Sequence, residues 1–179
     1  MSFRTIVILT CTADRNDPVV SSVINALRSL ACSEVKGTRL LVNICNADKD
    51  AYSDAHLYSH SHPFVVVPVM TPNLRLALQF KGGREWESGK DSDWDHPDRR
   101  KEMIQRLEGG ASINRYGLEV VYARAVPFRD QAPFQEFNWY CGAVGRERVA
   151  FSSLPATDID ASIADMVERI ANKAIDNRR

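Results

Sequence analysis

The sequence predicts a three-layer α/β protein with a mainly parallel, twisted sheet and helices on both of its faces. Continuous apolar runs of strand length alternate with amphipathic stretches of helix length, and unbroken apolar runs are typical of strands buried on both sides. With 179 residues, of which 44% are hydrophobic, the chain suffices for one well-buried core. We therefore expect a single domain over residues 1–179, interrupted by a polar loop insertion at about residues 81–97.

The stretch Arg4–Leu30 is the clearest unit of strand, loop and helix. Residues 5–9 (TIVIL) form an aliphatic and β-branched run, and loop-forming residues follow it. Asp17 followed by Pro18 predicts a helix that begins at about residue 18, because proline's missing N–H costs nothing in the first turn. The apolar stripe expected to face the sheet is Val20, Val23, Ile24, Leu27, Leu30 and Ala31.

Two further strands are expected in the first half of the chain. Lys36-Gly37 ends the first helical region, and Thr38–Cys45 is the second apolar run. Residues 63–70 (PFVVVPVM) form the third, and Pro68 predicts a bend or an edge position because it cannot donate to a ladder. We expect the first two strands to lie side by side in the same direction, so that the loops following them share one edge of the sheet.

The second half alternates in the same way. Thr71 and Pro72 predict the start of a short helix over residues 71–80, and residues 98–108 predict another. A strand is expected at 116–126, followed by a loop or lid at 127–138. One or two strands are expected within 140–154, of which 148–154 is the clearer. Thr157 is expected to cap the last helix, whose buried stripe is Ile159, Ile163, Met166, Val167, Ile170 and Ala174.

The loop after the first strand is the main candidate for a ligand site. Thr10, Thr12 and Arg15 lie near the expected helix N-terminus, where free backbone N–H groups favour an anion such as phosphate. Asp48 follows the second strand and is expected at the same edge. No catalytic residue is predicted.

Charge and composition exclude several classes of function. The chain has 23 basic and 23 acidic residues, so generic binding to nucleic acid or to an anionic membrane is not expected. No apolar run is long enough to span a bilayer and no signal peptide is evident, which predicts a cytoplasmic protein. The four cysteines, at positions 11, 32, 45 and 141, form no C-x-x-C pair, so reduced and mostly buried thiols are expected.

The first fifty residues resemble nucleotide-sugar glycosyltransferases of the GT-A type. The matching pieces are Ile8-Leu9-Thr10, Arg15, residues 26–30 (ALRSL), and the run at 40–45 that leads to Asp48 and Asp50. The resemblance implies a Rossmann-like sheet that binds a nucleotide or nucleotide-sugar. It also implies that Thr10, Thr12 and Arg15 hold the diphosphate or base. Asp48 would then accept a hydrogen bond from the ribose or base.

The same family holds a divalent metal on an Asp-x-Asp motif after a strand. Here the strand at 117–122 runs on into Ala123-Arg124 without paired acids, and the Asp-x-Asp patterns lie in the loop at 91–95. Asp91 and Asp93 are therefore the candidate ligands for Mg²⁺ or Mn²⁺, which take carboxylate oxygens. A solvated acidic loop is the alternative interpretation.

Three other groups of residues leave alternatives open. The histidines of DAHLYSHSH, at 54–62, suit either a polar loop or a general acid or base. Cys11 is either a structural thiol or a nucleophile. The aromatic segment at 127–141 suits base stacking, a core, or an interface in a homo-oligomer or larger complex. A non-catalytic subunit or adaptor that acts through protein contacts is thus the alternative to an enzyme.

Overall fold

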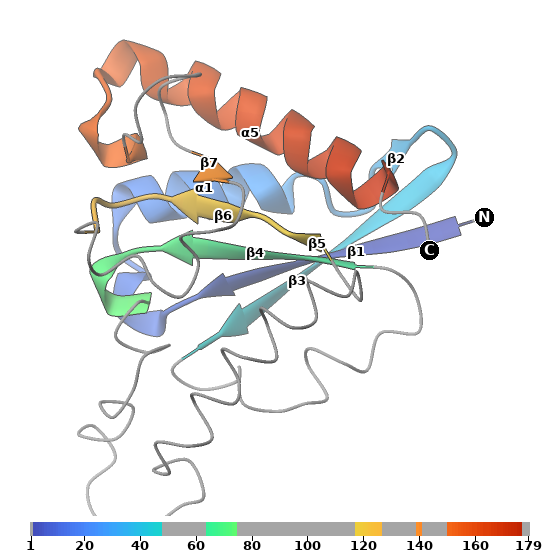
Figure 1. Cartoon of the computed structure of the whole chain (residues 1–179), viewed down its shortest axis with the longest axis horizontal. Helices are drawn as coiled ribbons and strands as arrows, with labels where there is room; N and C mark the ends of the chain where they lie inside the picture. Colours follow the sequence, from blue (N-terminus) through green and yellow to red (C-terminus); the bar gives the residue numbers. More distant parts are fainter. Residues whose placement is uncertain (1, 48–63, 75–116, 127–138, 141–149, 177–179) are drawn as a thin grey trace, which may run out of the picture.

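The computed structural model describes residues 2–47, 64–74, 117–126, 139–140 and 150–176, and these form a mixed, mainly parallel sheet with helices (Figure 1). The sheet order is β2-β3-β1-β4-β6-β7, and β5 pairs with β4 ahead of β6. The strands are β1 (Ser2–Thr10), β2 (Glu34–Val35), β3 (Thr38–Asn46), β4 (Phe64–Met70), β5 (Gly117–Leu118), β6 (Val120–Tyr122) and β7 (Trp139–Tyr140). The helices are α1 (Pro18–Arg28) and α5 (Ala156–Asp176), with short 3-10 helices η1 (Thr12–Asp14) and η6 (Phe151–Ser153).

Strand β1 lies between two parallel neighbours. It pairs with β3 along its whole length, from Ser2 opposite Thr38 to Thr10 opposite Asn46. On its other side, Thr5 to Leu9 of β1 pair with residues 64–68 of β4. The expected parallel arrangement of the first two strands is therefore confirmed. As a result, the chain segments that follow β1, β3 and β4 begin at the same edge of the sheet.

Helices α1 and α5 lie together on one face of the sheet (Figure 1). Their buried faces combine with the facing side chains of the strands into one core. Most of the expected stripes are confirmed, with these members buried in the core: Val20, Val23 and Leu27 of α1, and Ile163, Met166, Ile170 and Ala174 of α5. Ala31 lies beyond the end of α1 and is exposed. The α/β class is confirmed, whereas helices on both faces are not seen within the described ranges.

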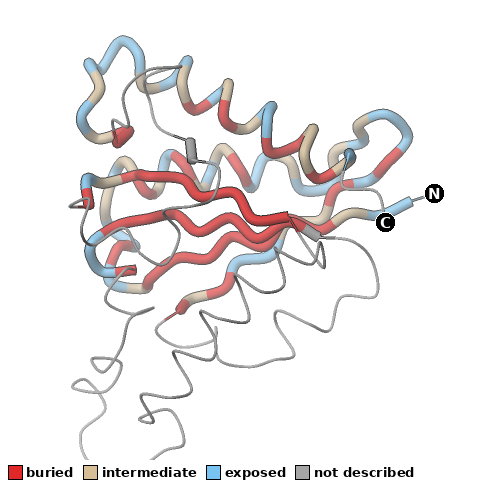
Figure 2. Tube along the Cα trace, viewed as in Figure 1, coloured by how far each residue is buried: buried red, intermediate tan, exposed pale blue. Residues whose placement is uncertain are grey.

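Both faces of the inner strands are buried, as the tube in Figure 2 shows. In β1, Ile6 and Ile8 face the helices, while the alternate side chains of Val7 and Leu9 face the other way. All four are at most 1% exposed. This pattern is typical of a sheet that is covered on both sides.

Pro68 occupies an interior strand, so its expected edge position is wrong. It pairs with Leu9 of β1 on one side, and β5 and β6 lie on the other. The N–H of Glu119 donates to the carbonyl of Val66, so by alternation the missing N–H of residue 68 faces Glu119. Glu119 is the residue between β5 and β6, where the hydrogen-bond ladder beside β4 is interrupted. Because the ladder is interrupted at this point, the sheet accommodates the missing N–H of Pro68.

Lys36 and Gly37 form the turn of a hairpin rather than the end of a helix. Helix α1 already ends at Arg28, and β2 pairs antiparallel with the start of β3. Val35 lies opposite Thr38, and the two residues between them have φ angles of 51° and 73°. Two positive φ values are the requirement of a tight type I′ hairpin turn.

Several expected boundaries shift. The strand expected at 116–126 is reduced to β5 and β6, and residues 151–153 of the strand expected at 148–154 form η6. Helix α5 begins at Ala156, so Thr157 lies inside it and does not precede it as a cap. Thr71 does cap the turn at 72–74, where its Oγ1 accepts from the N–H of Leu74 at 3.0 Å.

An ion pair between a buried glutamate and a partly exposed lysine joins α5 to the sheet. Glu119 is 1% exposed, and its Oε1 accepts from Lys173 Nζ at 2.8 Å. Burial of a carboxylate is costly unless a cation compensates it. Lys173 thereby fixes the C-terminal part of α5 over β5 and β6.

The hairpin turn gives a local test of the fold. Gly37→Ala is expected to lower the free energy of unfolding by about 1 kcal/mol, because a Cβ is disfavoured at positive φ. No atom lies within 4 Å of that Cβ position, so the cost is backbone strain alone. Lys36→Asn should instead raise the stability by some tenths of a kcal/mol, since asparagine tolerates this conformation. Urea denaturation measures both, and equal effects of the two changes would contradict the turn.

Candidate functional site

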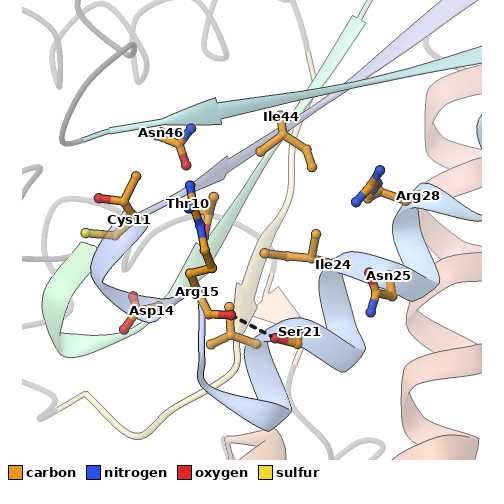
Figure 3. Close-up of a pocket in the computed structure, with 12 residues that line it drawn as sticks. Thr10, Cys11, Asp14, Arg15, Ser21, Ile24, Asn25, Arg28, Ile44 and Asn46 are labelled. Atoms are coloured by element: carbon orange, nitrogen blue, oxygen red, sulfur yellow. Dashed lines mark hydrogen bonds between the residues drawn. The ribbon is translucent and has the colours of Figure 1, made fainter.

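A pocket of about 330 Å³ opens where β1 and β3 end against helix α1 (Figure 3). Ligand sites of open α/β sheets commonly lie at this edge, outside the carboxyl ends of the strands. Three segments contribute to it, namely the end of β1 with the loop that follows, one face of α1, and the end of β3. The lining residues are Thr10, Cys11, Thr12, Asp14, Arg15, Val20, Ser21, Ile24, Asn25, Arg28, Ile44 and Asn46.

The structure brings together three of the residues expected to bind a ligand. Thr10, Thr12 and Arg15 all line the pocket. Asp48, Asp91 and Asp93, together with the histidines at 54–62, lie outside the described residues. The lining residues of α1 and β3 were not predicted, although Ser21, Asn25 and Arg28 have the i, i+4, i+7 spacing of one helix face.

Two arginines give the pocket its positive charge. Arg15 and Arg28 are both exposed, and neither forms an ion pair with any residue that the structure describes. The backbone of Arg15 is held by Ser21, whose Oγ donates to the Arg15 carbonyl at 3.2 Å. Figure 3 shows the Arg15 side chain extending from the loop toward Thr10 and Asn46 at the strand ends.

An apolar surface separates the two arginines. Ile24 of α1 and Ile44 of β3 lie between Arg15 and Arg28 in the view of Figure 3. Ile44 is 39% exposed, which makes it one of two large hydrophobic residues exposed in the described part of the chain. An apolar area beside a few polar and charged groups is the usual composition of a small-molecule site.

The N-terminus of α1 does not offer free N–H groups, so the expected anion site there is wrong. Pro18 has no N–H, and the carboxylate of Asp17 accepts from the N–H groups of Val19 at 2.9 Å and Val20 at 3.1 Å. The N–H of Ser21 donates to the carbonyl of Asp17. An anion in this pocket would therefore depend on side chains rather than on the end of the helix.

Asp17 also binds Arg124, which follows β6. The guanidinium donates through Nε to Oδ2 at 2.6 Å and through Nη2 to Oδ1 at 3.0 Å. Burial alone would raise the pKa of Asp17, but hydrogen bonds from Arg124 and from the backbone, together with the charge of Arg124, outweigh it and lower the pKa. The hydrogen bond to Asp17 likewise raises the pKa of Arg124, more than burial lowers it.

Asp14 joins the same loop to the chain beyond β4. Its carboxylate is 6% exposed and accepts from Thr71 Oγ1 at 2.5 Å and from Asn73 Nδ2 at 2.8 Å. Asp14 and Asp17 thus tie the loop to the segments that follow β4 and β6. Arg15 lies between Asp14 and Asp17 in this loop, and it lines the pocket.

Of the described cysteines, none is in a disulfide. Cys11 and Cys45 are buried, at 3% and 2% exposed, and Cys32 is exposed. Cys11 is thus a lining residue with little accessible surface. Over the described ranges, no three His, Cys, Asp or Glu side chains gather as a possible metal site.

Comparisons with protein-family models, with curated proteins and with solved structures find no match to this chain. Among the described helices, none combines the length and the apolar character that crossing a bilayer requires. The site must therefore be interpreted from its own chemistry.

The pair formed by Asp17 and Arg124 can be tested by a double-mutant cycle. Asp17→Asn keeps a side chain that caps helices well but loses the charge, so Asp17→Asn and Arg124→Gln should each destabilise the protein by about 1 kcal/mol. The double variant should lose little more free energy of unfolding than either single variant, because both changes remove the same interaction. If urea denaturation instead shows that the double variant loses the sum of the two single losses, the pair contributes nothing to stability.

The lowered pKa of Asp17 predicts a pH dependence with a definite sign. The folded pKa lies below the ordinary value of 3.8, so the stabilisation by the ionised carboxylate is complete well above pH 3.8. It is lost as the pH falls through the folded pKa. The stability difference between the wild type and Asp17→Asn should be constant from about pH 7 to pH 5 and shrink below about pH 4. A difference that grows on acidification would contradict this assignment.

Proposed function

We propose that the pocket binds a nucleotide or a nucleotide-sugar through its phosphate groups. The observation that carries the proposal is the presence of two arginines without ion pairs among the described residues, beside an exposed isoleucine, in one pocket at the strand ends. Guanidinium groups match the geometry and charge of phosphate oxygens. The isoleucines offer a surface for the flat face of a base.

Residues in and near the pocket have distinct roles in this proposal. Arg15 binds a phosphate close to the ends of β1 and β3. Thr10 and Thr12 line the same pocket, and their hydroxyl groups are proposed to add polar contacts. Arg124 offsets the charge of Asp17, and the Asp14 carboxylate accepts hydrogen bonds from Thr71 and Asn73 rather than from the ligand. Asp48 is proposed to bind the ribose or base.

The same proposal includes a three-layer, Rossmann-like fold and the transfer of a glycosyl group. The burial of both faces of β1 and β4 supports a three-layer, Rossmann-like arrangement. Glycosyl transfer is the reaction that the resemblance to GT-A enzymes implies, and Asp91 and Asp93 would then hold Mg²⁺ or Mn²⁺.

One observation favours a second function, that of a subunit which binds another protein. Beyond Leu40, the outer edge of β3 has no paired strand among the described residues, because β2 pairs only with Thr38 and Arg39. Exposed strand edges can accept a further strand from a partner. This edge ends at Ile44 and Asn46 beside the pocket, so a protein partner there would compete with a small ligand.

Calorimetric titration of the whole chain with UDP-, GDP- and dTDP-sugars, with and without Mn²⁺, tests the proposed function. At least one should bind, and Arg15→Gln should weaken it about tenfold, as expected for the loss of one charge-assisted contact of about 1.4 kcal/mol. Arg39→Gln is the matched control, since Arg39 is exposed at the other end of β3 and its loss should change the affinity less than twofold.

Two outcomes would count against the proposed function. If no nucleotide-sugar or free nucleotide produces heat, the pocket does not serve this class of ligand. If Arg15→Gln and Arg39→Gln weaken binding equally, the effect comes from net charge rather than from the site.

A further inference from the structure

We infer that the ligand carries two separated anionic groups, one bound by Arg15 and the other by Arg28, with an uncharged part between them. This inference rests on the proposed function and narrows its ligand to a nucleotide with a second anionic group distant from the first. A nucleoside bisphosphate and a nucleotide joined to an acidic sugar both belong to this class.

One side of the pocket is lined by α1, and Figure 3 shows the side chains of Arg15 and Arg28 on opposite sides of Ile24. Arg15 precedes the helix, whereas Arg28 is its last residue. Ser21, Ile24, Asn25 and Arg28 all line the pocket, so this side of it follows two turns of the helix. Seven residues of α-helix rise about 10 Å. In Figure 3 the two arginine side chains lie apart with Ile24 between them, so we do not expect one compact anion, such as a single phosphate, to bind both.

The charges of the lining are consistent with more than one anion. Arg15 and Arg28 are the basic residues of the lining, and Asp14 is the acidic one. The Asp14 carboxylate is buried and accepts hydrogen bonds from Thr71 and Asn73. Neither arginine has an ion-pair partner in the part of the chain that the structure describes. Within the described ranges, neither guanidinium group is therefore occupied by a carboxylate.

The middle of the pocket is suited to an uncharged group. Ile24 and Ile44 lie between the two arginines (Figure 3). Asn25 and Asn46 also line the pocket, and an amide side chain both donates and accepts hydrogen bonds without adding charge. A base or sugar that connects two anionic groups would match this order of cation, apolar surface and cation.

Arg28 also has a purely structural explanation. A basic residue in the last turn of a helix interacts favourably with the helix dipole. In that case Arg28→Gln would lower the melting temperature but would not change which ligands bind. The test below therefore measures a preference between ligands as well as stability.

The experiment titrates the whole chain calorimetrically with four probes at one fixed ionic strength. Three probes share one base and are the nucleoside, its 5′-monophosphate and its 3′,5′-bisphosphate, and the fourth is 1,5-pentanediol bisphosphate, which has no base. The bisphosphate should bind wild type about tenfold more tightly than the monophosphate. Arg28→Gln should abolish this preference while changing the monophosphate affinity by less than about twofold, and Arg15→Gln should weaken both nucleotides.

Two variants complete the design. Arg28→Lys keeps the positive charge and should retain part of the preference for the bisphosphate. Arg39→Gln removes an exposed arginine outside the pocket and should leave the preference unchanged. Melting temperatures of all variants separate the contribution of Arg28 to helix stability from its contribution to binding.

The outcomes distinguish this inference from the proposed function. If wild type binds nucleotides but prefers no second phosphate, or if Arg28→Gln weakens both nucleotides equally, the two-anion inference is wrong and nucleotide binding stands. If the base-free bisphosphate binds as tightly as the nucleotides and depends on Arg28, the two-anion inference stands and a nucleotide ligand is wrong. If wild type binds none of the probes, the two-anion inference is wrong, and the titration with nucleotide-sugars decides the proposed function separately.

Discussion

The parallel pairing of β1 with β3 and β4 determines where every part of the site begins. Because β1 and β3 are in register from one end to the other, Thr10 and Asn46 lie opposite each other at the same edge. The N–H of Ala47 then donates to the carbonyl of Thr10 at 2.7 Å and extends this alignment past the end of the strands. Helix α1 starts from the same edge and packs back along the sheet, so its outer residues meet the end of β3. The pocket is a consequence of this geometry.

The two acidic residues of the first loop hold it against its neighbours. In isolation, Asp14 and Asp17 argue against an anionic ligand, since carboxylates repel phosphate. In the folded chain each carboxylate has partners from a distant segment, Thr71 and Asn73 for Asp14 and Arg124 for Asp17. Asp17 also occupies the N–H groups that would otherwise form an anion site at the start of α1. An anion in this pocket would therefore bind to the arginine side chains rather than to the N-terminus of α1.

Local sequence signals predicted those parts of the fold that depend on short-range chemistry. Asp17-Pro18 predicted the start of α1, and the apolar stripes predicted which helix faces are buried. Predictions failed where partners distant in the sequence decide the outcome. Pro68 is typical of an edge strand, yet it lies in the interior because the interruption between β5 and β6 accommodates its missing N–H. Lys36-Gly37 is a different case, because the error was local: these residues form the two-residue turn between β2 and β3 rather than the end of a helix.

By itself, the sequence determined the α/β class, the parallel β1 and β3 pair, and the grouping of Thr10, Thr12 and Arg15, because each depends on hydrophobic periodicity or on the order of strand, loop and helix. Only the tertiary structure decided that Arg28 and Ile44 join that group, and that Asp17 is paired with Arg124 rather than facing a ligand. Residues 17 and 124 are far apart in the chain, and no local pattern encodes their contact. Their proximity follows from the packing of α1 against the sheet, which is a property of the whole fold.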